Sequence, residues 1–445
     1  MGNYSSLMCA NLRCVEKGQG RSFSPALRGE EKNIPLSGRF PLETIAKVKE
    51  KCYHKGMTYE ETILRLDALS PRGSVYGTER VERLLNRIGS PDEKLHIVHI
   101  AGTNGKGSTA TMLSAILQEA GHRVGLFTSP AVFDRRECFL VNGVPADGEK
   151  IARSFSRVLA FAEETTAFET EFCCALALFV DEECDYAVVE CGCGGLNDAT
   201  NAVSRKELAI ITSVSLDHTG LLGNTVEEIA RQKAGIVQDC PLVTGRQNSL
   251  VEQVFAPYRP VYAEEYEGKL SLKGPFQRYN AGIARTAATL LGASEEAIGR
   301  GLERAFLPGR FEHLATPTGT VILDGAHNED AAKKLLCALK SEGVEEAIFF
   351  VGMFADKAVD RVLSLLLPLA KKAIVLQAPL PRGMRAEELA KKASAYCDEV
   401  ILGTEEIITK TLSEAGTKVV CGSFSILSEM RRCIDGQTES RAGNP

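Results

Sequence analysis

The chain has 445 residues, of which 44% are hydrophobic and 25% charged, and this globular composition excludes a wholly disordered or collagen-like chain. Its 52 Lys and Arg against 58 Asp and Glu give a net charge of −6, which, without a dense basic cluster, predicts no nucleic-acid partner. No apolar run approaches the ~20 residues of a membrane-spanning helix, so we expect no membrane association. At about 150 residues per domain the length predicts two or three domains, and small molecules become the expected ligands.

Fourteen cysteines are scattered along the chain. The close pairs Cys173/Cys174 and Cys191/Cys193 do not have the spacing of a zinc site. A secreted disulfide framework would instead be a small, loop-rich domain. We therefore expect buried free thiols, Cys337 and Cys397 among them, in a protein of the reducing cytoplasm.

Residues 1–38 are polar, irregular and rich in Gly and Pro, which predicts a disordered extension. From residue 41 to residue 85 the apolar spacing is helical, with a turn at residues 71–73. A β-rich run at residues 95–100 then begins a series in which strands alternate with helices. Further strands are predicted at residues 186–190, 208–213, 320–324 and 347–351. This alternation predicts a parallel α/β sheet.

A Pro-Gly turn at residues 308–310 follows a helical pattern at residues 294–305 and predicts a hinge between a larger first domain and a smaller second one. We assign residues 39–305 to the first domain and residues 306–436 to the second. Residues 437–445 are expected to form a flexible tail.

A glycine-rich loop lies between the strand predicted at residues 95–100 and a helix with one apolar face. In such loops backbone N–H groups converge on an anion, and the helix N-terminus adds partial positive charge. Lys106 can then reach the terminal phosphates of a nucleotide while the Ser108 hydroxyl meets Mg²⁺. A glycine-rich turn without a ligand is the alternative, which the flanking strand and helix disfavour. The predicted nucleotide-binding residues of this loop are Gly102, Thr103, Asn104, Gly105, Lys106, Gly107, Ser108 and Thr109.

Two other predicted strands end in polar groups suited to the same nucleotide. Glu190 precedes glycines that allow close approach, and its carboxylate is a ligand type that Mg²⁺ prefers. A plain tight turn would also explain those glycines. His218 follows the strand at residues 208–213, although an isolated His is more often a structural residue.

Lys233 lies about two turns inside a helix that is predicted to start at Thr225, because Thr225 and Glu228 have the spacing of a capping box. Its apolar neighbours would bury the ammonium group, which then needs a partner or a chemical modification. Alternatively, the side chain extends to solvent.

Six segments, in the same order along the chain, resemble the folylpolyglutamate synthase/dihydrofolate synthase branch of the Mur ligase family. The first is the loop at residues 102–108, whose departure from the common P-loop is the form that this family uses. The others are Asp198-Ala199-Thr200-Asn201, Leu216-Asp217-His218-Thr219, Gln232-Lys233-Ala234-Gly235-Ile236, Pro308-Gly309-Arg310-Phe311-Glu312 and Asp324-Gly325-Ala326-His327-Asn328. The resemblance covers residues 57–436 and implies an α/β fold with a P-loop-type, parallel-sheet ATPase domain followed by a smaller Rossmann-like domain.

The resemblance implies an ATP-dependent acid–amino-acid ligase. A (tetrahydro)folate carboxylate takes the γ-phosphate of ATP to form an acyl phosphate, and the amine of L-glutamate displaces the phosphate to give folylpolyglutamate. Dihydropteroate is a second implied acceptor, and we expect a monomer. Such an enzyme must chiefly position its reactants and neutralise phosphate charge. The alternatives are a Mur-type ligase for a different carboxylate and amino acid, and a nucleotide-binding paralogue without turnover.

The resemblance also implies roles for single residues. Lys233 is implied to be carbamylated and to hold a second Mg²⁺ ion. The implied protein ligands of the metal are Ser108, Glu190, His218 and Lys233, and the implied catalytic residues are Lys106, Lys233 and His327. Arg310 is implied to meet nucleotide phosphate, Asn280 to lie near adenine, and Asp324 and His327 to serve nucleotide and glutamate. The implied substrate residues are Asp198, Thr200 and Ser423.

Three loop segments depart from the family's pattern, and all are expected near the pterin or its glutamate tail. The family has Ser-Pro-His-Leu, Glu-Arg and Gly-Gly-Arg-Leu-Asp at these places. This chain has Ser129-Pro130-Ala131-Val132, Glu137-Cys138 and Gly194-Gly195-Leu196-Asn197-Asp198. The first 56 residues have no counterpart in the family.

Overall fold

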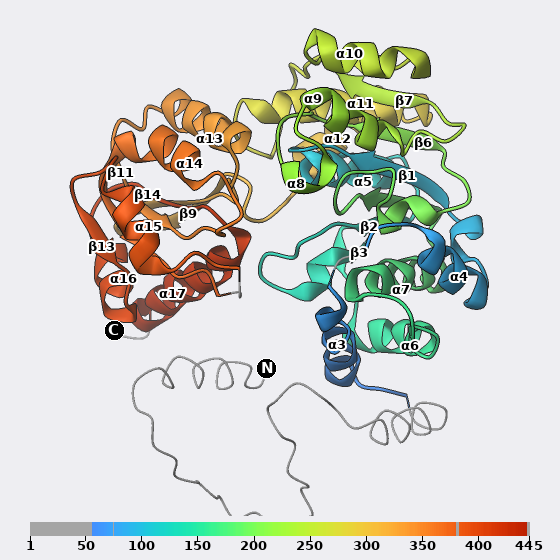
Figure 1. Ribbon diagram of the computed structural model, residues 1–445, viewed down its shortest axis with the longest axis horizontal. Coiled ribbons are helices and arrows are strands. Elements are labelled where there is room, and N and C mark those ends of the chain that lie inside the picture. The colour runs from blue at the N-terminus through green and yellow to red at the C-terminus, as the bar shows by residue number, and fades with distance from the viewer. Residues whose placement is uncertain (1–55, 74, 380–381, 443–445) are drawn as a thin grey trace, which may run out of the picture. The chain divides into compact units, whose positions relative to one another are not determined.

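The structure, a computed structural model, describes residues 56–73, 75–379 and 382–442. The extension predicted at residues 1–38 lies outside the described residues. Two β-sheets, each covered by helices, follow one another along the described chain (Figure 1). The predicted α/β fold class is thereby confirmed.

The first sheet has eight strands in the order β4-β3-β2-β5-β1-β6-β7-β8. The strands from β2 to β8 in that order are parallel, whereas β3 and β4 pair antiparallel at one edge. Their bounds are β1 (His96–Ala101), β2 (Val124–Phe127), β3 (Phe139–Val141), β4 (Val144–Pro145), β5 (Tyr186–Glu190), β6 (Leu208–Ile211), β7 (Leu242–Gly245) and β8 (Val261–Ala263). The helices of this part are α3 (Tyr59–Asp67), α4 (Glu79–Arg87), α5 (Lys106–Glu119), α6 (Gly148–Leu159), α7 (Ala167–Asp181), α8 (Thr219–Leu222), α9 (Val226–Ala234), α10 (Ser249–Phe255), α11 (Phe276–Leu290) and α12 (Glu295–Arg304).

The second sheet has six strands in the order β13-β12-β11-β14-β10-β9, with only β9 antiparallel to its neighbour. Their bounds are β9 (Glu312–Thr316), β10 (Gly319–Leu323), β11 (Ala347–Val351), β12 (Ala370–Val375), β13 (Val400–Leu402) and β14 (Lys418–Cys421). Its helices are α13 (Glu329–Ser341), α14 (Val359–Leu366), α15 (Ala386–Ala393), α16 (Glu405–Leu412) and α17 (Phe424–Ala442). The predicted hinge at residues 308–310 lies between α12 and β9. Helix α17 covers residues 437–442, which the sequence analysis assigns to a tail.

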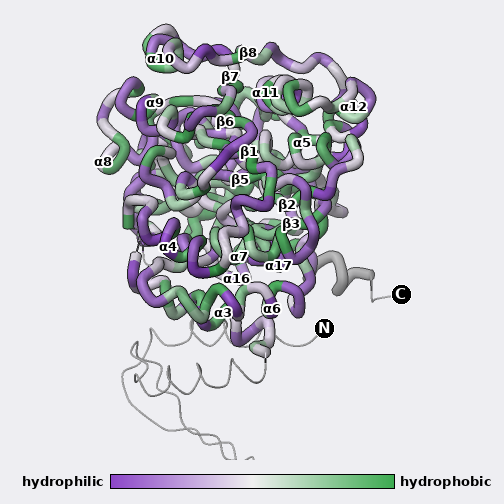
Figure 2. The backbone as a smooth tube through the Cα atoms, turned by 90° about the vertical axis from the view of Figure 1, so that its right-hand side faces the viewer, coloured by the Kyte–Doolittle hydropathy of each residue, from purple (hydrophilic) through white to green (hydrophobic). Residues whose placement is uncertain are grey.

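The central strands are apolar because both faces of each sheet are covered by helices. On β1, Ile97 packs into the cluster shared with α7, while Val98 and Ile100 pack against α5 on the opposite face. Figure 2 shows α7 as mostly hydrophobic and α4 as mostly hydrophilic, since α7 is buried along most of its length. The carboxyl ends of parallel strands meet at one edge of a sheet, so the loops that follow them converge there.

The cysteines of the described residues are free thiols. Cys173, Cys174 and Cys397 are buried, as predicted, but Cys337 is exposed. The prediction for Cys337 is wrong because the buried positions of α13 include Leu335, Ala338 and Leu339, and the helical periodicity places Cys337 away from that face. No helix within the described residues combines the length and the apolar character needed to cross a membrane.

Candidate active site

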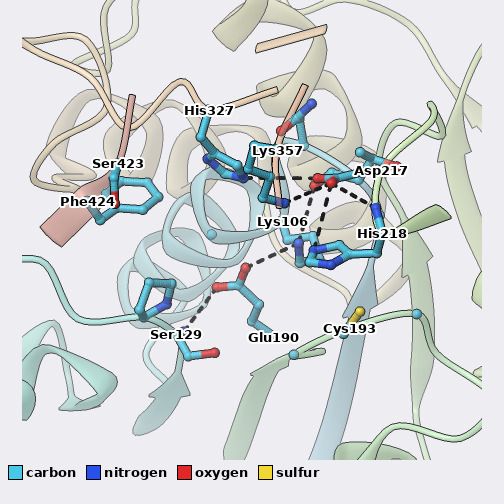
Figure 3. A pocket seen from close by; sticks show the side chains of 18 of the residues that line it. Lys106, Ser129, Glu190, Cys193, Asp217, His218, His327, Lys357, Ser423 and Phe424 are labelled. Atoms are coloured by element: carbon cyan, nitrogen blue, oxygen red, sulfur yellow. Dashed lines mark hydrogen bonds and ion pairs between the residues drawn. The ribbon is translucent and has the colours of Figure 1, made fainter. Parts of the chain in front are cut away.

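A cavity of about 380 Å³ lies where loops from both sheets meet (Figure 3). Almost every segment of its wall follows the carboxyl end of a strand, as expected for an α/β fold. From the first sheet these are residues 102–107 after β1, 129–131 after β2, 190–194 after β5 and 217–222 after β6. From the second sheet these are His327 after β10, Phe354 and Lys357 after β11, Arg382 after β12 and residues 423–425 after β14. Lys233 of α9 and Arg310 of the hinge complete the wall.

The predicted phosphate loop joins β1 to α5. Gly102 and Gly105 have φ angles of 153° and 89°, and a Cβ at either position would collide with Thr212 or Asn280. The loop is anchored to the segment after β6, because the Thr103 amide donates to the Ser213 carbonyl at 2.6 Å. Only glycine fits both positions, so this backbone is built for close approach to a ligand.

Lys106 begins α5 and turns its ammonium group towards Glu190. The Lys106 Nζ atom lies 3.8 Å from Glu190 Oε1 and donates to the Thr103 carbonyl at 3.3 Å. Glu190 is 4% exposed, and burial raises its pKa although Lys106 and Arg310 oppose the shift. The pairing of β1 with β5 brings Lys106 and Glu190 together, because Ile100 lies opposite Glu190 just before the phosphate loop begins.

Ser108 and Thr109 follow Lys106 within the first turn of α5 and are buried. The Ser108 hydroxyl accepts a hydrogen bond from Gln277 Nε2 at 3.3 Å, and Asn280 donates to Gln277 at 2.9 Å. A second, smaller cavity of about 50 Å³ touches Ser108, Asn280, Arg310 and Asp324. Thr109 reaches neither cavity wall. Gln277, whose role was not predicted from the sequence, orients both Ser108 and Asn280.

Lys233 is 3% exposed, so the alternative in which it extends to solvent is wrong. Its helix begins at the predicted capping box: Thr225 accepts from the Glu228 amide, and Glu228 accepts from the Thr225 amide. Burial, reinforced by Lys106, lowers the pKa of Lys233 to about 8. A substantial fraction of this amine is therefore neutral at mildly alkaline pH.

His218 caps α8 with a left-handed φ of 49°. Its side chain is 40% exposed and its Nε2 atom lies 3.9 Å from Asp217 Oδ1. Burial of its inner part lowers the pKa of His218. The imidazole is thus mainly neutral at pH 7, which is the form that can bind a metal.

The predicted metal ligands only partly converge. Glu190, His218 and Lys233 line the larger cavity, whereas Ser108 faces the smaller one behind Gly107. Within the described residues, no three His, Cys, Asp or Glu side chains form a metal cluster. The donor set present, which is one hydroxyl, one carboxylate and one imidazole, fits a Mg²⁺ ion that completes its shell with phosphate and water oxygens.

Asp217 connects the two halves of the cavity. Its Oδ1 atom accepts from Lys357 Nζ at 2.8 Å, and its Oδ2 atom accepts from Asn328 at 2.9 Å. Both members of the Asp217–Lys357 pair are at most 10% exposed. Burial alone would raise the pKa of Asp217, but Lys357 and the neighbouring His218 and His327 hold it well below its usual range.

Lys357→Met is expected to lower the free energy of unfolding by about 3 kcal/mol, because it leaves a buried carboxylate without its cation. The stabilisation from Asp217 is present above its unfolded pKa of about 3.9 and is lost as pH falls through the depressed folded pKa. Urea unfolding at pH 7 measures the loss. Lys333→Met, which breaks an exposed i,i+4 pair with Glu329, is the control and should cost no more than about 0.5 kcal/mol. Equal effects of the two variants would contradict the buried-pair interpretation.

Arg310 and His327 line the larger cavity, and Arg310, Asp324 and His327 all line the smaller one. The Arg310 guanidinium lies 4.2 Å above the Phe424 ring, and burial lowers its pKa. Asp324 accepts from the Phe311 and Ala326 amides, both at 2.8 Å, and burial raises its pKa to about 6. His327 Nδ1 lies 2.8 Å from the Gly325 carbonyl, so Nδ1 carries the proton and Nε2 is free to accept one.

The predicted substrate residues fall into two groups. Ser423 lines the cavity and its hydroxyl lies 2.8 Å from that of Ser425. Asp198 and Thr200 are buried behind the wall. Asp198 accepts from the Cys193 amide at 2.7 Å, and thus fixes the loop at residues 192–194.

The residues at which this chain differs from the family's motifs can also be located in the structure. Ala131 lines the cavity, whereas Cys138 is buried and Leu196 is 46% exposed. Glu137 accepts from the backbone amides of residues 132–134 and so holds the loop that contains Ala131. The loop shape therefore does not depend on a basic residue at position 138.

Two family models match the chain: the Mur ligase middle domain over residues 100–254 and the Mur ligase glutamate ligase domain over residues 309–424. The dihydrofolate synthase/folylpolyglutamate synthase of Bacillus subtilis is 31% identical over 407 residues, which cover 80% of this chain and 94% of that protein. The chain belongs to this family. The prediction made from its six sequence motifs is confirmed.

Two solved structures show the same architecture. Escherichia coli FolC in complex with DHPP and ADP superposes with a TM-score of 0.77 at 28% identity, covering 86% of this chain and 99% of that one. The bifunctional folylpolyglutamate synthase/dihydrofolate synthase of Yersinia pestis, complexed with AMPPNP and a Mn ion, gives a TM-score of 0.75 at 28% identity over 85% and 98% of the two chains.

Proposed function

We propose that this protein is an ATP-dependent ligase that adds L-glutamate to the carboxylate of a folate. One observation carries the proposal: the Lys106–Glu190 pair of the phosphate loop faces the same cavity as His327 and Lys357 of the second sheet. A ligase of this kind needs both a site for phosphate and a site for the incoming amine. The relatives that bind ADP, DHPP or AMPPNP support this assignment.

ATP is the substrate of the phosphate loop. The amides of residues 102–107 and the ammonium of Lys106 receive its phosphates, while Asn280 and Asp324 line the adjoining small cavity. Ser108, Glu190 and His218 would hold Mg²⁺, which supplies positive charge against the phosphate oxygens when bound. The Arg310 guanidinium borders both cavities and neutralises phosphate charge from the second sheet.

The folate carboxylate attacks the γ-phosphorus, ADP leaves, and an acyl phosphate remains. The glutamate nitrogen then attacks the acyl carbon, and phosphate leaves as the amide bond forms. The ammonium of glutamate must first lose a proton. His327 is proposed to accept a hydrogen bond from the glutamate ammonium through its unprotonated Nε2 atom and so to orient the amine. Burial lowers the pKa of His327 to about 4, so the proton passes on to water instead of remaining on the imidazole. Lys357 and Arg382 provide cations for the carboxylates of glutamate.

Lys233 is proposed to carry a carbamate that holds a second Mg²⁺ ion. A buried amine with a lowered pKa is partly neutral, and the neutral amine is the form that reacts with CO₂. The carbamate also turns a buried cation beside Lys106 into an anion that a metal can pair. This removes the repulsion between two neighbouring ammonium groups.

The acceptor is tested directly. Purified protein is incubated with ATP, labelled glutamate and either tetrahydrofolate or dihydropteroate, and label in the acceptor is counted. Label in tetrahydrofolate establishes folylpolyglutamate synthesis, and label in dihydropteroate establishes dihydrofolate synthesis. If neither acceptor gains label but another carboxylate stimulates ATP hydrolysis, the result would favour a Mur-type ligase for a different substrate. The replacements at Ala131 and Leu196 are the observations that keep this alternative open.

Deleting residues 1–38 should leave the melting temperature and the ligase activity nearly unchanged. The segment is rich in polar residues, and it lies outside both family matches. Differential scanning calorimetry and the labelled-glutamate assay on the truncated and full chains check this. A large drop in either quantity would show that the segment docks on the rest of the protein.

A further inference from the structure

Lys206, just before β6, is a buried lysine outside the cavity wall. It is 4% exposed, and its ammonium group donates to three neutral oxygens. These are Asn201 Oδ1 at 2.6 Å, the Ile236 carbonyl at 3.0 Å and Gln238 Oε1 at 3.0 Å. All three donor positions of the ammonium group are thus used, and each is fixed in direction.

Two of these acceptors, Ile236 and Gln238, lie in the segment that directly follows α9, the helix that carries Lys233. The last carbonyl groups of a helix have no partner within it. Here they are satisfied from outside: the Leu196 amide donates to the Gln232 carbonyl at 2.7 Å, and Asn201 Nδ2 donates to the Gly235 carbonyl at 3.2 Å. Lys206 adds the bond to Ile236 and places a positive charge at the helix C-terminus, where it is favourable.

Asn201 connects this cap to the wall of the cavity. Its side-chain amide also donates to the Leu196 carbonyl at 3.0 Å, so the loop at residues 194–197 and the end of α9 are held by one side chain. The Asn201 oxygen in turn accepts from Lys206. The loop and helix pack so closely that a Cβ at Gly195 would lie 3.0 Å from the Lys233 Cα atom.

We propose that Lys206 is a positioning residue for Lys233. By bonding Asn201, Ile236 and Gln238 together it fixes the last turn of α9, and therefore the direction in which the Lys233 side chain enters the cavity. The inference rests on the proposed function, in which Lys233 carries a carbamate and holds a metal ion. None of the six sequence motifs that carry the family resemblance includes Lys206.

Lys418 on β14 supplies a matched control. It too is fully buried and donates to neutral oxygens, which are those of Thr318 and the Glu414 carbonyl. It belongs to the second sheet and does not border either cavity. Lys206→Met and Lys418→Met therefore remove the same kind of buried ammonium group, but only the first removes hydrogen bonds to the segment that directly follows α9.

The test measures the Lys233 carbamate by carbon-13 NMR with labelled bicarbonate at neutral pH, together with kcat and KM for ATP. In Lys206→Met we expect a weaker carbamate signal per folded molecule, a kcat lower by about 10- to 100-fold, as misplacement of a reacting group can cause, and a KM for ATP near that of the wild type. In Lys418→Met we expect a lower melting temperature with signal and kcat unchanged.

Circular dichroism first establishes that each variant is folded. If Lys206→Met is not, Lys206→Gln, which keeps two of the three N–H donors but loses the charge, replaces it with the same expectations. A folded Lys206 variant with wild-type signal and kcat, or a Lys418 variant that loses both, would overturn the inference. Wild-type protein that shows neither carbamate nor product would overturn the proposed function and this inference with it.

Discussion

Replacing Lys106 by Ala is expected to abolish ATP-dependent ligation while the protein remains folded. The Lys106 ammonium points at the phosphate loop and at Glu190, 3.8 Å away, and not into an apolar core. Removing one preorganised charge from a water-poor site typically costs 10²-fold or more in rate, about 3 kcal/mol. The labelled-glutamate assay measures the loss, and circular dichroism measures the fold.

Lys150→Ala is the control for Lys106→Ala, because Lys150 is a half-exposed cation on α6 that pairs with Glu182. It should leave the rate unchanged. If Lys106→Ala instead turned over at the wild-type rate, the assignment of residues 102–107 as the phosphate loop would be wrong.

Replacing Lys233 by Ala is expected to remove most of the activity, because the variant cannot form the carbamate that holds the second ion. Added short carboxylic acids should restore part of it, since a free carboxylate can occupy the space and the charge of the missing group. Unlike Lys418, the Lys233 ammonium makes no hydrogen bond or ion pair with another of the described residues, so its removal should not by itself destabilise the fold. Activity with and without added acetate, and the carbon-13 carbamate signal of the wild type, are the measurements.

Arg231→Ala is the matched change for Lys233→Ala, because Arg231 is an exposed cation of the same helix and its removal should alter stability by no more than about 0.5 kcal/mol. Full activity in Lys233→Ala, or an active wild-type sample without a carbamate signal, would mean that Lys233 is a structural residue.

The strands that build the site could largely be predicted from the sequence. Residues 186–190 and 347–351 form β5 and β11 as predicted, because their apolar runs are buried on both faces. The positions of the phosphate loop and of Glu190 could be predicted from these strands, since the loop follows β1 and Glu190 ends β5. The strand β2 was missed because Gly125 interrupts its apolar run, and glycine is uncommon in strands.

The second sheet's contribution to the site could be predicted only in part. Lys357 and Arg382 follow β11 and β12 in loops without a recognisable motif, and Lys357 meets Asp217 across 140 residues of sequence. Asp217 stood inside a quoted motif, but its role depends on that distant lysine. Gln277 was missed for the same reason, since its bond to Ser108 exists only after α11 packs on α5.

The charge of the cavity wall has a consequence for how the enzyme responds to its solution. Leaving aside Lys233, whose charge changes with the proposed carbamate, the described wall residues comprise four cations (Lys106, Arg310, Lys357 and Arg382) and two carboxylates (Glu190 and Asp217), an excess of two positive charges. A low-dielectric cleft with an excess of positive charge attracts anions. The free enzyme therefore accumulates inorganic anions in this cavity. Sulfate and phosphate in the buffer should therefore compete with ATP, and the apparent KM for ATP should rise with ionic strength, because added salt shortens the range of the field.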